Sequence, residues 1–196
     1  MNKDNELIWE KVSEEHIVRD EFIDFRKSAY RFPNGEVFEP FYSYSRRDYV
    51  VIVARDEDGR YICVRQFRQG LERVTTEFPA GGIERDGEAQ YARNSDKAAE
   101  DALDAAKREL SEETGYTADK WTHLGTFPAN PTIADNYAHL FYASGCTKES
   151  ELSLDETEFL DVDLFTREEI DEMVKNGEFP QPIHVLGMLL ADSYCS

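Results

Sequence analysis

The sequence predicts an α+β fold of the mixed α/β kind, and three observations carry this prediction. Short apolar runs of strand character recur along the chain, two or three stretches have helical composition, and the regular strand–helix alternation of a doubly wound sheet is missing. The chain has 196 residues, 40% hydrophobic and 12% aromatic, which suits roughly one domain plus a small module. We predict a main domain over residues 49–196 and an N-terminal strand module over residues 1–48.

The N-terminal half contains candidates for antiparallel strands. Alternating stretches at residues 16–20 and 36–45 flank Pro33-Asn34-Gly35, which has the composition of a hairpin turn. Residues 49–54 form the longest apolar run and predict a buried strand. Residues 60–68 alternate, so we expect them to be its hairpin partner.

The C-terminal half mixes helices and strands. A helix is predicted over residues 98–114, because its composition is strongly helical and Gly115 follows as a left-handed cap. A second helix is expected over residues 167–175, between an N-cap at Thr166 and a terminating Gly177. The remaining elements expected are strands at residues 122–127, 137–143 and 159–165, and a last helix over residues 183–191.

Composition excludes several classes of partner. The chain carries 22 Lys and Arg against 41 Asp and Glu, a net charge of −19. This balance disfavours nucleic acid and anionic membrane surfaces, which are bound by basic side chains. A small phosphorylated ligand stays possible, because a metal ion reverses the sign of one site. Three scattered cysteines and the absence of an apolar leader favour a reducing, cytoplasmic location.

Three glutamates crowd one face of the helix predicted over residues 98–114. On a helical wheel Glu112 lies about 60° to one side of Glu109, and Glu113 lies about 40° to the other. Three negative charges within one helical turn repel one another. A hard divalent cation, which binds carboxylate oxygens, would relieve this repulsion. A bare pattern of this kind in an acidic protein is also compatible with a solvated acidic face. The glycine pair that follows Ala80 favours the metal, since Gly lets backbone approach a ligand.

Taken together, these segments resemble the Nudix box, G-x5-E-x7-R-E-U-x-E-E-x-G-U, in which U is a bulky apolar residue. The second half of the box is complete from Glu100 through Arg108-Glu109-Leu110-Ser111-Glu112-Glu113 to Gly115-Tyr116, and Ala80-Gly81-Gly82 matches its start. The resemblance implies a Nudix hydrolase, an α/β/α sandwich around a mixed sheet that cleaves a nucleoside diphosphate linked to another moiety X.

The resemblance also implies residue roles. Glu109, Glu113 and Glu112 would bind Mg²⁺, with Mn²⁺ as a possible substitute, and the carbonyl of Ala80 would complete the metal site. Arg108 would orient the glutamates through ion pairs. This chain departs from the pattern in one respect, because about thirteen extra residues separate Gly81 from Glu100. Either Glu88 or Glu100 could therefore fill the first glutamate position, and the inserted loop 85–97 is expected to be dispensable.

The flanking residues resemble the ADP-ribose pyrophosphatase branch of the family. Pro131 lies fifteen residues after Tyr116, a spacing typical of this branch, although a plain loop proline fits equally well. Arg47 and Arg68 match positions that hold phosphates, with surface ion pairs as the simpler alternative for each. The acidic loop around residues 154–159 resembles one that supplies a catalytic base, with Glu156 as first choice and Glu158 as second.

In this branch the N-terminal strands help to form a homodimer and lend an aromatic side chain to the base pocket. Phe41 is our candidate, within the wider aromatic set of Tyr30, Phe32, Phe38, Phe41 and Tyr42. The sequence thus predicts Mg²⁺-dependent hydrolysis of ADP-ribose to AMP and ribose 5-phosphate. The alternatives are another nucleotide sugar such as GDP-mannose, a dinucleoside polyphosphate, or a catalytically silent nucleotide sensor.

Overall fold

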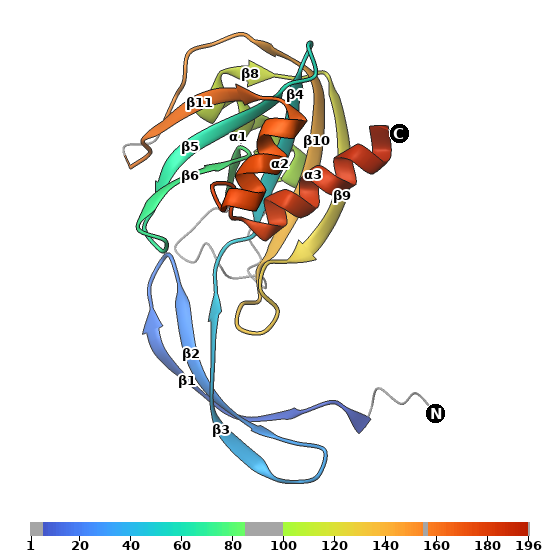
Figure 1. The fold of residues 1–196 in the computed structure, drawn as a ribbon. Coiled ribbons are helices and arrows are strands. Elements are labelled where there is room, and N and C mark those ends of the chain that lie inside the picture. Colours follow the sequence, from blue (N-terminus) through green and yellow to red (C-terminus); the bar gives the residue numbers. More distant parts are fainter. Residues whose placement is uncertain (1–5, 85–99, 155–156, 196) are drawn as a thin grey trace. The chain divides into compact units, whose positions relative to one another are not determined.

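The computed structural model describes residues 6–84, 100–154 and 157–195 (Figure 1). The inserted segment 85–97, Glu88 and Glu156 lie outside the described residues. The chain divides into two compact units. The first takes in residues 6–47 and Pro128–Tyr137, and the second takes in Asp48–Glu84, residues 100–127 and the chain from Ala138 onward.

The first unit is a three-stranded antiparallel sheet in the order β1-β2-β3. Its strands are β1 (Glu10–Arg19), β2 (Asp24–Arg31) and β3 (Val37–Ser45). The turn predicted at Pro33–Gly35 joins β2 to β3, and Gly35 takes a φ of +89° there. The Asn34 side chain accepts a hydrogen bond from the Glu36 amide at 3.0 Å. β1 is exposed along its whole length, so this sheet buries little of its apolar surface by itself.

The second unit is built on an eight-stranded mixed sheet with the central order β11-β5-β4-β10-β8. β6 pairs with β5, β7 with β4, and β9 with β10. β4 and β10 run parallel, which makes the sheet mixed. Its strands are β4 (Tyr49–Asp56), β5 (Tyr61–Arg68), β6 (Arg73–Glu77), β7 (Ala80–Gly82), β8 (Tyr116–Thr117), β9 (Lys120–Pro128), β10 (Tyr137–Lys148) and β11 (Leu160–Phe165).

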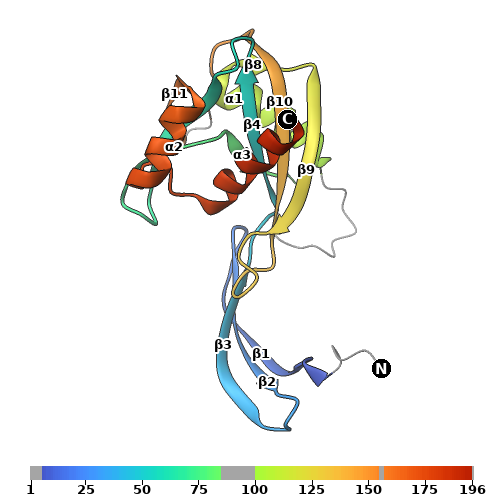
Figure 2. The same ribbon diagram turned by 45° about the vertical axis from the view of Figure 1, so that its right-hand side comes forward.

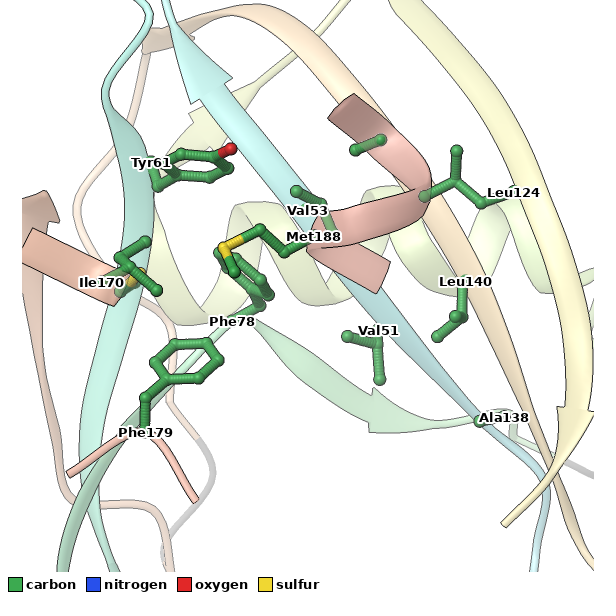
Figure 3. Close-up of a cluster of buried hydrophobic side chains, with 12 residues drawn as sticks. Val51, Val53, Tyr61, Phe78, Leu124, Ala138, Leu140, Ile170, Phe179 and Met188 are labelled. Carbon is green, nitrogen blue, oxygen red and sulfur yellow. The ribbon is translucent and has the colours of Figure 1, made fainter. Parts of the chain in front are cut away.

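Helices cover both faces of this sheet, with α1 (Ala102–Thr114) on one side and α2 (Arg167–Asn176) and α3 (Pro182–Cys195) on the other (Figures 1 and 2). β4 is buried on both faces, because its side chains alternate between the two cores. Val51 and Val53 pack with Phe78, Phe179 and Met188 under α2 and α3 (Figure 3), and the intervening residues of β4 pack under α1. The α/β/α sandwich implied by the family resemblance is confirmed.

α1 begins later than predicted. Asp101 is its N-cap and accepts a hydrogen bond from the Leu103 amide at 2.9 Å. At the other end Gly115 adopts a φ of +73° and its amide bonds Ser111, as the left-handed cap predicts. Ala105, Ala106 and Leu110 are fully buried against the sheet, so the carboxylates of the same helix lie at the rim of a packed core.

The strand expected at residues 16–20 covers only the end of β1, and β2 was not predicted. The short strands β6, β7 and β8 were also not predicted, because two to five residues carry too little periodicity to stand out. The N-cap at Thr166 and the end of α2 at Gly177 are confirmed, and Glu169 completes a capping box with Thr166. No helix among the described residues combines the length and the apolar character needed to cross a membrane.

Candidate functional site

β7 and α1 meet at Gly81 and Glu109. A Cβ built on Gly81 would lie 1.9 Å from Cδ of Glu109 and 2.0 Å and 2.2 Å from its two oxygens. Any side chain at position 81 would therefore displace the carboxylate. Glycine is required at position 81 because the Glu109 side chain approaches the backbone closely there, and not because the chain turns.

Arg108 gathers the acidic groups around this contact. Its Nε and Nη2 both bind the Glu100 carboxylate at 3.1 Å, and Nη2 also reaches the Gly82 carbonyl at 3.1 Å. Its Nη1 binds Glu109 at 2.9 Å and Glu112 at 3.0 Å. One guanidinium thus forms ion pairs with three carboxylates and a hydrogen bond to the end of β7.

Glu100 is one of the two residues considered for the first box glutamate. Its backbone amide bonds the carbonyl of Glu84 at 3.0 Å, and its carboxylate accepts from the Glu84 amide at 3.2 Å. Glu84 and Glu100, which flank the inserted segment in the sequence, are therefore hydrogen-bonded to each other. This pairing explains how α1 keeps its place despite about thirteen additional residues in the sequence between.

Glu113 is the most buried of the α1 glutamates. It is 3% exposed and accepts a hydrogen bond from the Ala80 amide at 3.0 Å. Burial raises the pKa of Glu113 well above its usual value, against the effect of the Ala80 amide, and the charges of Glu109, Glu158 and Glu77 raise it further. Burial likewise raises the pKa of Glu109 to about 7, although Arg108 opposes the shift. These two carboxylates therefore hold their negative charge at a cost that a cation would remove.

Glu158 is within electrostatic reach of both carboxylates, because its charge contributes to the raised pKa of Glu109 and of Glu113. Glu112 is more open, with a side chain 41% exposed. Within the described part of the chain, no three His, Cys, Asp or Glu side chains already converge on one point as a metal-binding group. Arg108 bonds one oxygen of Glu109 and one of Glu112, and the Ala80 amide bonds one oxygen of Glu113.

A NUDIX domain model matches residues 45–183. The chain belongs to the NUDIX family. Its match to the ADP-ribose pyrophosphatase of Bacillus subtilis is 33% identical over 174 residues, covering 85% of this chain and 83% of that protein. The methanol dehydrogenase activator of Bacillus methanolicus is 34% identical over 127 residues, covering 64% and 62%. The predicted family and the predicted enzyme class, a Nudix-type hydrolase, are confirmed.

A solved structure described as an ADP compounds hydrolase has the same fold. It superposes with a TM-score of 0.75 and 22% sequence identity, covering 95% of this chain and 93% of that one. At this identity the likeness concerns the fold alone. It agrees with the layered arrangement of the Nudix domain described above.

The structure places the residues predicted to bind substrate in different units. Arg68 lies at the end of β5 and forms an ion pair with Glu77. Arg47, Phe41 and Pro131 belong to the first unit. Phe41 contacts Trp9, Tyr30, Phe32 and Phe38 in an aromatic cluster. The Arg47 side chain and Pro131 are exposed, and the Arg47 carbonyl accepts from Asn136 at 3.2 Å.

One buried acidic residue of the Nudix domain was given no role from the sequence. Glu77 ends β6, three residues before Ala80, and is completely buried. A signal existed in the sequence, because a glutamate directly before the apolar Phe78-Pro79-Ala80 run is an unusual neighbour for a buried segment. Its partners, however, come from β5 and from the start of α3, and only the folded chain brings them together.

Proposed function

We propose that this Nudix hydrolase cleaves the pyrophosphate bond of a nucleoside diphosphate linked to X in the presence of Mg²⁺, with ADP-ribose as the first candidate substrate. The observation that carries the proposal is the pair Glu109 and Glu113, buried against Ala80–Gly81 with raised pKa values. The relative in Bacillus subtilis, named an ADP-ribose pyrophosphatase, supports this choice of substrate. Water would add across the bond, giving AMP and ribose 5-phosphate.

The residues present fit a divalent cation. The donor set consists of carboxylates and one backbone carbonyl, the hard oxygen ligands that Mg²⁺ prefers. We assign Glu109, Glu112, Glu113 and the Ala80 carbonyl as the residues that would hold it, with Mn²⁺ as a substitute. When bound, the cation supplies charge neutralisation on the pyrophosphate and a lower pKa for a bound water. Arg108 would keep the carboxylates in place, because it already bonds Glu109 and Glu112.

A carboxylate from the loop before β11 would take the proton of the attacking water. Glu158 is supported by its electrostatic reach to Glu109 and Glu113. Glu156, the other candidate, lies outside the described residues. Comparing Glu156→Gln with Glu158→Gln separates them, because removal of a general base costs about 10²- to 10⁴-fold in kcat.

The test is product release with Mg²⁺ across a small panel: ADP-ribose, GDP-mannose, a UDP-sugar, a diadenosine polyphosphate and NADH. Preference for ADP-ribose, with AMP and ribose 5-phosphate as products, supports the proposal. Preference for another compound keeps the metal site and replaces the substrate. Nucleotide binding without turnover on any compound would contradict hydrolysis and favour a silent sensor.

We also propose that the chain forms a homodimer through the first unit. The support is apolar surface that the described chain leaves uncovered, with Trp9 47%, Ile17 46% and Phe38 55% exposed. β1 is in addition an exposed edge strand, which readily pairs with another chain. Light scattering should give twice the chain mass, and Ile17→Asp should shift the protein to monomer. A monomeric wild type at micromolar concentration would contradict this assignment.

A further inference from the structure

A buried polar cluster lies at the junction of β5, β6 and the start of α3. The carboxylate of Glu77 is completely buried there. Its Oε1 accepts hydrogen bonds from Gln66, at 2.6 Å, and from Arg68, and its Oε2 accepts from Gln181. A buried carboxylate is stable only when such donors replace water. We call these four residues the Glu77 cluster.

The short segment that follows Glu77 is tied to both faces of the sheet. The Phe78 amide donates to Nδ1 of His184 on α3 at 3.1 Å, and the Ala80 amide donates to Glu113 on α1 at 3.0 Å. Burial lowers the pKa of His184 to about 3, so its ring is neutral and can accept this hydrogen bond. Glu77 therefore lies three residues before Ala80, whose amide bonds the Glu113 carboxylate.

Arg68 differs from its partner in exposure. Its side chain is 34% exposed, while that of Glu77 is 0% exposed. Within the described residues, Arg68 has Glu77 as its one carboxylate partner and its buried Nε makes no hydrogen bond. Glu77 thus holds one edge of the guanidinium and leaves part of it exposed to solvent. Arg68 lies on β5, which pairs with β6, the strand that ends three residues before Ala80.

We propose that Glu77 is a positioning residue that holds the Arg68 guanidinium ready for a phosphate of the substrate. The inference rests on the proposed function, in which Arg68 contacts the pyrophosphate. A free arginine loses side-chain entropy when it binds an anion, and a partner that fixes it beforehand removes this cost. Gln66 and Gln181 complete the cluster by satisfying the other lone pairs of the buried carboxylate.

A purely structural role is the competing explanation, because a buried ion pair also joins β5 to β6. The two roles differ in how they affect kinetics. A positioning residue acts only through Arg68 and on substrate binding, whereas a structural residue changes stability whatever stands at position 68.

The experiment measures KM and kcat for ADP-ribose, and Kd for AMP by calorimetry, in a double-mutant cycle of Glu77→Gln and Arg68→Ala. Glu77→Gln keeps the shape and removes the charge. It should raise KM and Kd about three- to tenfold, as expected for loss of one pre-ordered side chain, with kcat changed less than about threefold. In the Arg68→Ala background the same substitution should change KM less than about twofold.

Asp192→Asn is the matched control. Asp192 lies on α3 in another partly buried ion-pair cluster, with Arg55 at 2.5 Å, and shares no residue with the Glu77 cluster. It should lower the melting temperature without changing KM. If Glu77→Gln yields no folded protein, Glu77→Asp is the alternative variant. It shortens the side chain by one methylene, keeps the charge and moves the carboxylate away from Arg68, so it should show the same rise in KM.

The outcomes separate this inference from the proposed function. Equal effects of Glu77→Gln in both backgrounds, or an unchanged KM and Kd in the folded variant, would overturn the positioning role while wild-type turnover still supports the function. A wild type that binds AMP without turnover overturns the function, and the Kd values alone then decide the role of Glu77. A wild type that neither binds nor hydrolyses these compounds overturns both.

Discussion

Two sets of buried carboxylates in the Nudix domain differ in how many hydrogen-bond donors the fold supplies to them. Glu77 receives three side-chain donors from β5 and from the start of α3. Glu109 and Glu113 are nearly as buried, yet Glu109 shares one arginine with its neighbours and Glu113 bonds one backbone amide. The contrast shows that burial alone does not mark a functional acid. We propose that the functional acids are those whose charge the fold leaves incompletely compensated, Glu109 and Glu113.

The largest expected effect comes from Glu113. Glu113→Gln should reduce Mg²⁺-dependent kcat about 10³-fold, because the cation is worth several kcal/mol in stabilising transition-state charge. The metal-free variant should be no less stable than the wild type, since a costly buried charge is gone. Product release and thermal melting check both statements. The exposed Glu172→Gln is the control, and equal activity of the two variants would refute the metal site.

A second test moves Glu109 without changing any acid. Gly81→Ala should push the Glu109 carboxylate away, because the added Cβ would lie 1.9 Å from Cδ. A displacement of about 1 Å can cost about 100-fold in rate. Gly70→Ala is the matched control, as a Cβ there meets nothing within 4 Å. Similar kcat values for both variants would mean that the position of Glu109 is unimportant.

The raised pKa of Glu109, about 7, predicts how stability depends on pH in the metal-free protein. In the folded protein the Glu109 carboxyl keeps its proton up to about pH 7, whereas in the unfolded chain it releases the proton near pH 4.5. Stability should therefore fall as pH rises from about 5 to 8, by about 2 kcal/mol from this group. Added Mg²⁺ should restore it at pH 8. Urea melts of the wild type and of Glu109→Gln measure the difference, and parallel pH curves would contradict the shift.

The smallest effect is expected at the Glu77 cluster. Gln181→Ala removes one donor from the buried carboxylate and should lower the free energy of unfolding by about 1–2 kcal/mol. Unlike the changes at α1, this loss should be the same with and without Mg²⁺. Denaturant unfolding in both conditions provides the measurement. A loss that Mg²⁺ reverses would show that the two carboxylate sets are coupled more strongly than their separate partners indicate.

The amino-acid sequence by itself determined much of the fold and of the site. The run at residues 49–54, the capping residues Thr166 and Gly177, and the left-handed Gly115 are local signals, and each lies where it was predicted. The spacing of Glu109, Glu112 and Glu113 around Arg108 also follows from helix geometry alone. Such features depend on neighbours within a few residues, so periodicity and composition are sufficient to find them.

Tertiary structure decided the features that depend on distant neighbours. The need for glycine at position 81 comes from a helix residue 28 positions later, and the burial that raises the pKa of Glu113 comes from packing against β7. Glu77 acquired its partners from residues 66, 68 and 181 only through folding. Local sequence fixes which charges lie on one helix face, whereas the packed core decides how much water and how many donors each charge keeps.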